Sequence, residues 1–103
     1  MTKPVTVAEI VTFRLADGAD ETAFISAAAA VEDKLQSSGQ MLARTLSRTE
    51  DGLWTDHVIW RSQEAASAAA QEVMQSPVCA PFLALIDNDS VAMSHGAIAR
   101  RMD

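Results

Sequence analysis

Two histidines and two carboxylates in predicted strands are the side chains of this sequence best suited to proton transfer. Asp56 and His57 are neighbours in the extended run 53–60. Glu9 lies in an earlier run of alternating polarity, and His95 lies near the C-terminus. Histidine exchanges a proton near neutral pH, and a carboxylate can do so when burial raises its pKa. The sequence therefore offers four candidates for a general base, of which we expect His95 or His57 to act.

Each candidate also has a purely structural interpretation. His95 can be a hydrogen-bonded strand residue beside a bulge at Gly96, and His57 can be satisfied under the helices or at the edge of the sheet. The two carboxylates can be ion-pair partners of arginines such as Arg44. Only the tertiary structure separates these interpretations from the catalytic one.

Metal and cofactor chemistry have no signature in the sequence. Cys79 is the single cysteine, and with two distant histidines it does not form ligand spacing of the zinc type. There is no glycine loop of the kind that holds phosphates and no serine elbow. We therefore predict no metal and no organic cofactor, and we expect Cys79 to be a small buried apolar residue.

Composition indicates one domain over residues 1–103, with 1–4 and 99–103 as flexible tails or dimer arms. The net charge is -6 and the hydrophobic fraction is 49%. A negative surface repels nucleic-acid phosphates and anionic lipid, and no apolar run reaches the roughly 18 residues of a membrane span. Since the first residues lack an apolar leader, we expect a cytoplasmic protein that binds neither nucleic acid nor membrane.

The periodicity of the chain changes repeatedly between that of a strand and that of a helix. Asp20 and Ser62 are predicted helix N-caps, and Asp51-Gly52 predicts a tight primed hairpin turn. Pro77 and Pro81 interrupt the second helix, which we expect to restart at Pro77 at an angle. The predicted strands cover 5–15, 40–49, 53–60 and 91–98, and the predicted helices begin after Asp20 and Ser62.

This order predicts an α+β, ferredoxin-like split βαβ fold (βαββαβ) with a four-stranded antiparallel sheet and two helices on one face. The other face is then bare, although the strands carry apolar residues on both faces, such as Val11 on one and Ile10 on the other. Such a surface favours a partner. We predict a homodimer packed sheet against sheet, with the pocket between the two sheets.

Three short motifs mark the junctions between the predicted elements. The first opens the first helix, the second joins the third strand to the second helix, and the third breaks the second helix. They are Gly18-x-x-x-x-x-Phe24, Trp60-x-Ser62-x-Glu64-Ala65, and Ser76-Pro77 followed by Phe82.

With these motifs the chain resembles, over nearly its whole length, the antibiotic-biosynthesis monooxygenase-like group of the dimeric α/β-barrel superfamily. The resemblance implies a homodimer with a cavity in each subunit. In some members it implies cofactor-independent oxygenation of polycyclic phenols, quinols or anthrones, while other members have no established reaction. A related branch degrades haem, but Leu83 stands at the position of its haem-ligating histidine and cannot bind iron.

The same resemblance places Trp60 on the cavity wall. Side-chain alternation then puts Val58 and Asp56 on the same face, whereas His57 points under the helices. The predicted substrate-binding residues are Trp60, Asp56, Val58, Phe13, Val11 and Glu9.

Two functions remain open from the sequence. The first is a cofactor-independent monooxygenase-like protein that acts on an aromatic or quinol-type metabolite, with His95 or His57 as base. The second is a non-catalytic homodimeric ligand-binding or stress-related module whose cavity its own side chains fill. A titratable group that reaches an open cavity discriminates between them.

Overall fold

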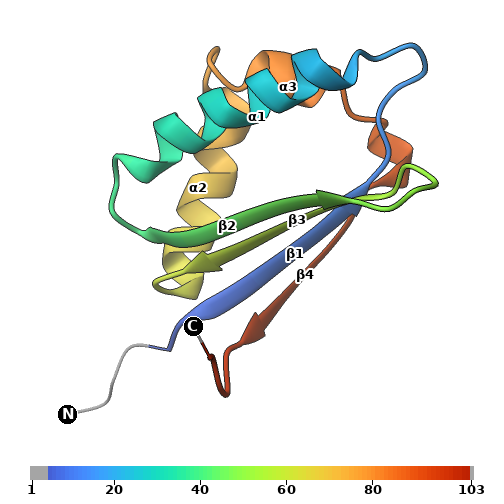
Figure 1. Cartoon of the computed structure of the whole chain (residues 1–103). Helices are drawn as coiled ribbons and strands as arrows, with labels where there is room; N and C mark the ends of the chain where they lie inside the picture. The colour runs from blue at the N-terminus through green and yellow to red at the C-terminus, as the bar shows by residue number, and fades with distance from the viewer. Residues whose placement is uncertain (1–4, 103) are drawn as a thin grey trace.

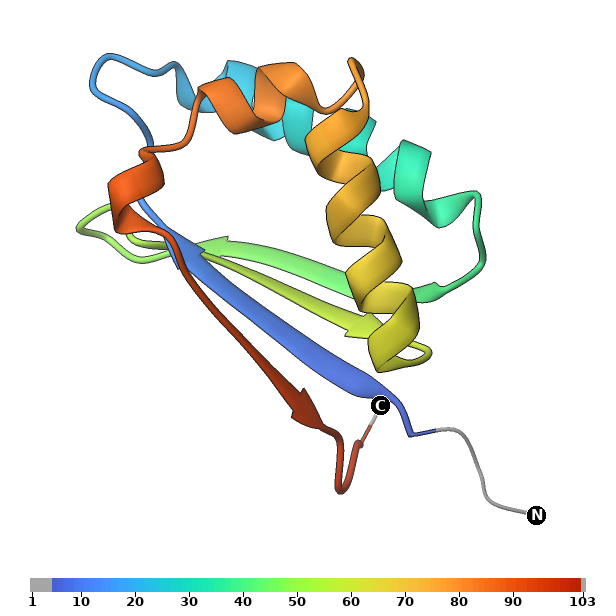
Figure 2. The same ribbon diagram turned by 180° about the vertical axis from the view of Figure 1, so that it is seen from behind.

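Residues 5–102, which the computed structural model describes, form one antiparallel sheet with its helices on a single face (Figure 1). The opposite face of the sheet carries no covering element in this part of the chain, as the view from behind also shows (Figure 2). In chain order the elements are β1 (Val7–Phe13), α1 (Glu21–Gln36), β2 (Met41–Arg48), β3 (Trp54–Trp60), α2 (Gln63–Gln75), α3 (Ala80–Ala84), the 3-10 turn η1 (Asn88–Ser90) and β4 (Ala92–Ala97).

The strand order β2-β3-β1-β4 confirms the predicted α+β ferredoxin-like sheet. All three neighbouring pairs are antiparallel, and β1 lies between β3 and β4. Because β1 and β3 are central, their side chains are covered best, and both strands alternate between buried and more exposed positions. This alternation decides which residues face the helices.

Both long helices begin at the predicted caps. The side chain of Asp20 accepts a hydrogen bond from the Ala23 amide at 3.3 Å, and that of Ser62 accepts from the Ala65 amide at 3.0 Å. Each cap satisfies an amide that has no partner within its helix. The capping residues thus fix where the chain leaves the sheet for the helical layer.

The break in the second helix differs from the prediction in position. α2 ends at Gln75, and the next helix begins at Ala80 rather than at Pro77. Ser76 is extended, and Pro81 occupies the first turn of α3, where a missing amide hydrogen costs nothing. Residues 77–79 therefore form a turn before α3 starts.

The β2–β3 hairpin is confirmed, but the predicted tight primed turn at Asp51-Gly52 is wrong. Arg48 pairs with Trp54, so five residues connect the strands. Gly52 has φ of +90° and donates its amide hydrogen to the Thr49 carbonyl at 3.1 Å. The glycine is needed for its positive φ, as predicted, within a longer loop.

The last strand is regular where an irregularity was expected. β1 and β4 pair in unbroken register from Val7 with Ala97 to Thr12 with Ala92, which excludes a bulge at Gly96. The register shift of the sheet lies instead in β2, between Met41 and Ala43. His95 consequently points to the same face as its partner Glu9.

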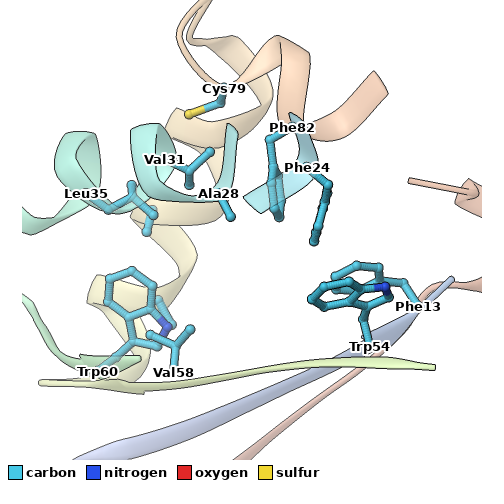
Figure 3. Packing of buried hydrophobic residues seen from close by; sticks show 12 residues of the cluster. Phe13, Phe24, Ala28, Val31, Leu35, Trp54, Val58, Trp60, Cys79 and Phe82 are labelled. Atoms are coloured by element: carbon cyan, nitrogen blue, oxygen red, sulfur yellow. The ribbon is translucent and has the colours of Figure 1, made fainter. Parts of the chain in front are cut away.

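An aromatic cluster forms one part of the core (Figure 3). The Phe24 ring lies 4.9 Å from Trp54, 5.2 Å from Phe82 and 5.6 Å from Phe13, measured between ring centroids. α1 adds Ala28, Val31 and Leu35 from the same buried stripe. Cys79 is fully buried, as predicted for a small apolar residue.

Within residues 5–102 no helix combines the length and the apolar character needed to cross a membrane. The tail predicted at 1–4 lies outside the described residues. Residues 98–102 follow β4 without regular secondary structure.

Candidate functional site

A cavity of about 380 Å³ lies between the sheet and the helices. Its floor comes from all four strands, and its roof comes from α1, α2 and α3. We expected a pocket on the other face, between two sheets, and the structure corrects this. Trp60 and Val58 do face the cavity, but the helices cover that face.

Small side chains on α2 leave this space open. Ala69 and Ala70 line the cavity where the neighbouring helix α1 presents Val31 and Leu35. A methyl group reaches only a short way from the helix backbone, so it cannot fill the distance to the sheet. The alanine-rich stripe of α2, which includes Ala66, Ala69 and Ala70, is visible in the sequence.

The cavity walls are mainly apolar. Val11, Phe13, Val58 and Trp60 line it from the strands, in agreement with the predicted alternation, while their role in binding substrate stays a prediction. Trp54 shares their face but belongs to the aromatic cluster. Three methionines add flexible walls: Met41, Met74 and Met93.

A buried ion pair closes one side of the cavity. Arg44 Nε and Nη2 donate to Asp56 Oδ1 and Oδ2 at 3.0 and 2.7 Å, and Arg44 Nη1 donates to the Ala28 carbonyl at 2.8 Å. Burial lowers the pKa of Arg44, but the hydrogen bond and charge of Asp56, helped by two other carboxylates, outweigh burial and raise it overall. Since both Asp56 oxygens are held, we do not assign Asp56 as a base.

Glu9 and His95 form a second polar pair. The distance from Glu9 Oε2 to His95 Nε2 is 2.7 Å, which is hydrogen-bond distance. The side chain of Glu9 is 12% exposed and that of His95 27% exposed. Glu9 lines the cavity, whereas His95 lines a separate hollow between β4 and the start of α2.

These polar residues share one row across the sheet. Arg44 is opposite Val58, Val58 is opposite Glu9, and Glu9 is opposite His95. Directly opposite residues point to the same face. The row thus runs from a cation on β2 through an apolar wall to the carboxylate and imidazole on β1 and β4.

His57 lies away from the cavity. It is exposed, and alternation along β3 places it on the opposite face of the sheet from Trp60. The expectation that His57 points under the helices is wrong, because the helices cover the Trp60 face. The structure therefore separates the two histidines, with only His95 on the helix-covered face.

The indole of Trp60 carries an unsatisfied hydrogen-bond donor. Its Nε1 atom is buried and has no acceptor among the described residues, and the residue is 2% exposed. A buried N–H without a partner is costly, so an oxygen atom of a bound ligand would stabilise it. The described residues contain no group of three or more His, Cys, Asp or Glu side chains placed to hold a metal ion.

No family model matches the sequence, and no curated protein matches it either. Solved structures, however, share the fold over nearly the whole chain. One is a protein of Bordetella bronchiseptica provisionally named an antibiotic biosynthesis monooxygenase, with a TM-score of 0.75, 13% identity and coverage of 93% of this chain and 99% of that one.

Two further neighbours have similar coverage. SnoaB, a cofactor-independent oxygenase from Streptomyces nogalater, has a TM-score of 0.65 and 19% identity, and 96% of each chain is covered. Rv0793 from Mycobacterium tuberculosis has a TM-score of 0.71 and 19% identity over 95% of this chain and 99% of that chain. The resemblance to the antibiotic-biosynthesis monooxygenase-like group is confirmed at the level of the fold.

Proposed function

We propose that the cavity is the active site of a cofactor-independent oxygenase that acts on a planar aromatic or quinol-type metabolite. One observation carries the proposal: Glu9 is the cavity-lining carboxylate of the described residues that no arginine holds. A carboxylate in a mainly apolar cavity is suited to take a proton from a bound carbon or oxygen acid.

The dimensions and walls of the cavity support an aromatic ligand. About 380 Å³ is within the range of small-molecule sites. Valine, tryptophan and methionine side chains offer apolar contacts to flat rings. This open space argues against a module whose cavity is filled by its own side chains.

The proposed reaction requires no group beyond the chain, the substrate and oxygen. The Glu9 carboxylate takes a proton from an activated CH₂ group, and the resulting carbanion transfers an electron to O₂. The radical pair combines to a peroxide, which takes a proton back and loses water, so that CH₂ and O₂ become C=O and H₂O. The Trp60 N–H can donate to the oxygen that carries negative charge in the anion.

The fold supports the same proposal. SnoaB is a cofactor-independent oxygenase with this architecture. The TM-score of 0.65 shows a common fold, and the identity of 19% leaves the reaction of this chain to experiment.

A homodimer through the bare face of the sheet is part of the proposal. The outward positions of the strands carry His57 but no Asp, Glu, Lys or Arg, although the chain as a whole has a net charge of -6. The apolar members of this face, such as Ile10 and Ile59, favour contact with a second copy of the chain. The outward residues are Ala8, Ile10, Thr12, Ala43, Thr45, Ser47, Thr55, His57, Ile59, Ala92, Ser94 and Gly96.

Light scattering tests the dimer. We expect twice the chain mass of 11.0 kDa at micromolar concentration. Replacing Ile10, which is 42% exposed, by Asp places a charge on this face and should yield the monomer. A monomeric wild-type protein would contradict the dimer.

Oxygen uptake by metal-free and flavin-free protein tests the activity. Offered anthrones, naphthohydroquinones and catechols, the protein should show saturable uptake with at least one of them above spontaneous oxidation. Glu9→Gln should lower kcat by about 10²-fold or more, because an amide cannot accept the proton. Glu72→Gln is the matched control, since Glu72 pairs with Lys34 on the helix surface.

A different outcome would identify the alternative function. Saturable binding of an aromatic compound without oxygen uptake from any substrate would indicate a ligand-binding module. Uptake that survives Glu9→Gln would show that another group is the base.

A further inference from the structure

We infer that His95 relays protons between Glu9 and solvent while a ligand fills the cavity. The inference rests on the proposed function and deepens it. It assigns His95 a role in proton transfer that does not require contact with the substrate, and it explains why two adjoining hollows meet at one hydrogen bond.

The pair connects two spaces that are otherwise separate. Glu9 lines the cavity under the helices, and His95 lines the hollow between β4 and the start of α2. The 2.7 Å contact between Glu9 Oε2 and His95 Nε2 is the link. The helix-side wall of the outer hollow is formed by Ser62, Gln63 and Glu64.

A bound ligand would leave Glu9 few routes to water. The Glu9 side chain is only 12% exposed, and a ligand that occupies the cavity covers its inner side. Across the row on β3 its neighbour is Val58, which cannot carry a proton. On β4 its neighbour is the imidazole of His95, whose side chain is 27% exposed.

The transfer balances in protons without any co-reactant. The Glu9 carboxylate takes a proton from the substrate carbon and becomes a carboxylic acid. The acid passes a proton from Oε2 to Nε2 of the neutral imidazole, and the imidazolium releases its Nδ1 proton to water in the outer hollow. The reverse sequence returns a solvent proton to the substrate carbanion.

The charges around His95 suit a transient imidazolium. Glu9 faces it from β1, and Glu64 lines the same hollow from the first turn of α2. No lysine or arginine lines this hollow among the described residues. A short-lived positive charge at His95 would therefore be stabilised by its surroundings.

Deuterium exchange under anaerobic conditions tests the inference. Without O₂ the full-length protein should convert bound anthrone to its anion and back, and absorbance measures the rate at which the anion forms. In D₂O, mass spectrometry of the recovered anthrone measures how much deuterium returns to the carbon. The amount of deuterium returned to the carbon is divided by the amount of anion formed, after the Glu9→Gln background is subtracted from both. This ratio reports on proton exchange between Glu9 and solvent.

We expect His95→Gln to lower this ratio by about tenfold or more, because glutamine keeps a hydrogen bond to Glu9 but relays no proton. His57→Gln, the same chemical change on the far face of the sheet, should leave the ratio as in the wild type. A defect of folding alone would lower anion formation and deuterium return together, so it would not change the ratio.

The outcomes separate the two proposals. If His95→Gln forms the anion and returns deuterium in the wild-type ratio, the relay role of His95 is overturned and Glu9 remains the base. If the wild-type protein forms no anion above the Glu9→Gln background with any anthrone or naphthohydroquinone of the panel, the proposed oxygenase function is overturned. The relay role of His95, which rests on that function, is then overturned as well.

Discussion

The two ends of the space between sheet and helices are built in opposite ways. At one end Phe13 and Trp54 of the sheet meet Phe24 and Phe82 of the helices, and the rings are in contact. At the other end Trp60 stands below Leu35 and Val31, and the space between them is open (Figure 3). The same sheet face supports both ends, so the helices make the difference.

The composition of the helices explains this difference. Burying a large apolar side chain contributes about 1.5–3 kcal/mol, and the aromatic end collects several of them. α2 contributes mainly alanines to the other end, including Ala66 and Ala69. We conclude that stability is concentrated at the packed end, whereas the capacity to bind a ligand is concentrated at the hollow end.

The largest expected effect comes from breaking the packed end. Phe24→Ala should lower the free energy of unfolding by about 3–5 kcal/mol, because Phe24 is fully buried among three aromatic rings. Val73→Ala at the cavity wall should cost about 1 kcal/mol, since Val73 faces open space on one side. Urea unfolding of both variants measures the contrast, and equal losses would contradict it.

A smaller effect on stability, but a clear one on binding, should follow from filling the hollow end. Ala69→Leu projects three more carbon atoms into the cavity. We expect the affinity for an aromatic probe such as 2-naphthol to fall about tenfold or more, while the free energy of unfolding changes by no more than about 1.5 kcal/mol. Fluorescence titration measures the affinity.

Ala68→Leu is the control for this change. Ala68 lies on the exposed side of the same helix and does not line the cavity. Its substitution should alter neither affinity nor stability. If the probe binds Ala69→Leu as tightly as it binds the wild type, the ligand site lies elsewhere.

The smallest effect concerns an exposed loop beyond the packed end. The hydrogen bond from the Thr49 hydroxyl, together with Arg14, holds the pKa of Asp51 below its ordinary value. A carboxylate with a lowered folded pKa stabilises the fold above its unfolded pKa of about 3.8, and this stabilisation is lost as the pH falls through the folded value.

Thermal unfolding across the acid range checks the sign. Asp51→Asn should be slightly less stable than the wild type near neutral pH, and the difference should disappear at acid pH, where Asp51 is protonated in both states. Because Asp51 is exposed, we expect only a small shift of the unfolding midpoint. A difference that grows as the pH falls would contradict the assigned direction.

Much of the fold follows from local patterns in the sequence. Alternation of side chains predicted that Trp60, Val58 and Asp56 share one face, and capping chemistry predicted the starts of α1 and α2. The turn at Gly52 was predicted for its positive φ, but the loop length was not. Local rules succeed here because the deciding interactions span a few residues.

The site depended on contacts between residues far apart in the chain. The pairing of Glu9 with His95 requires β4 to lie beside β1 in one particular register, and the pairing of Arg44 with Asp56 requires the same of β2 and β3. A shift of one residue in either register would turn these side chains to opposite faces. For this reason the sequence offered both His95 and His57 as candidates for the base.

By itself, then, the sequence determined the order of the elements and which side chains share a face of each strand. Only the tertiary structure decided which face the helices cover, and so placed the cavity above Trp60 and left His57 outside it. The physical reason is that alternation divides the side chains of a strand between two faces but does not show which face the helices cover. Packing of α1 and α3 onto Phe13 and Trp54, with alanines on α2, makes that distinction.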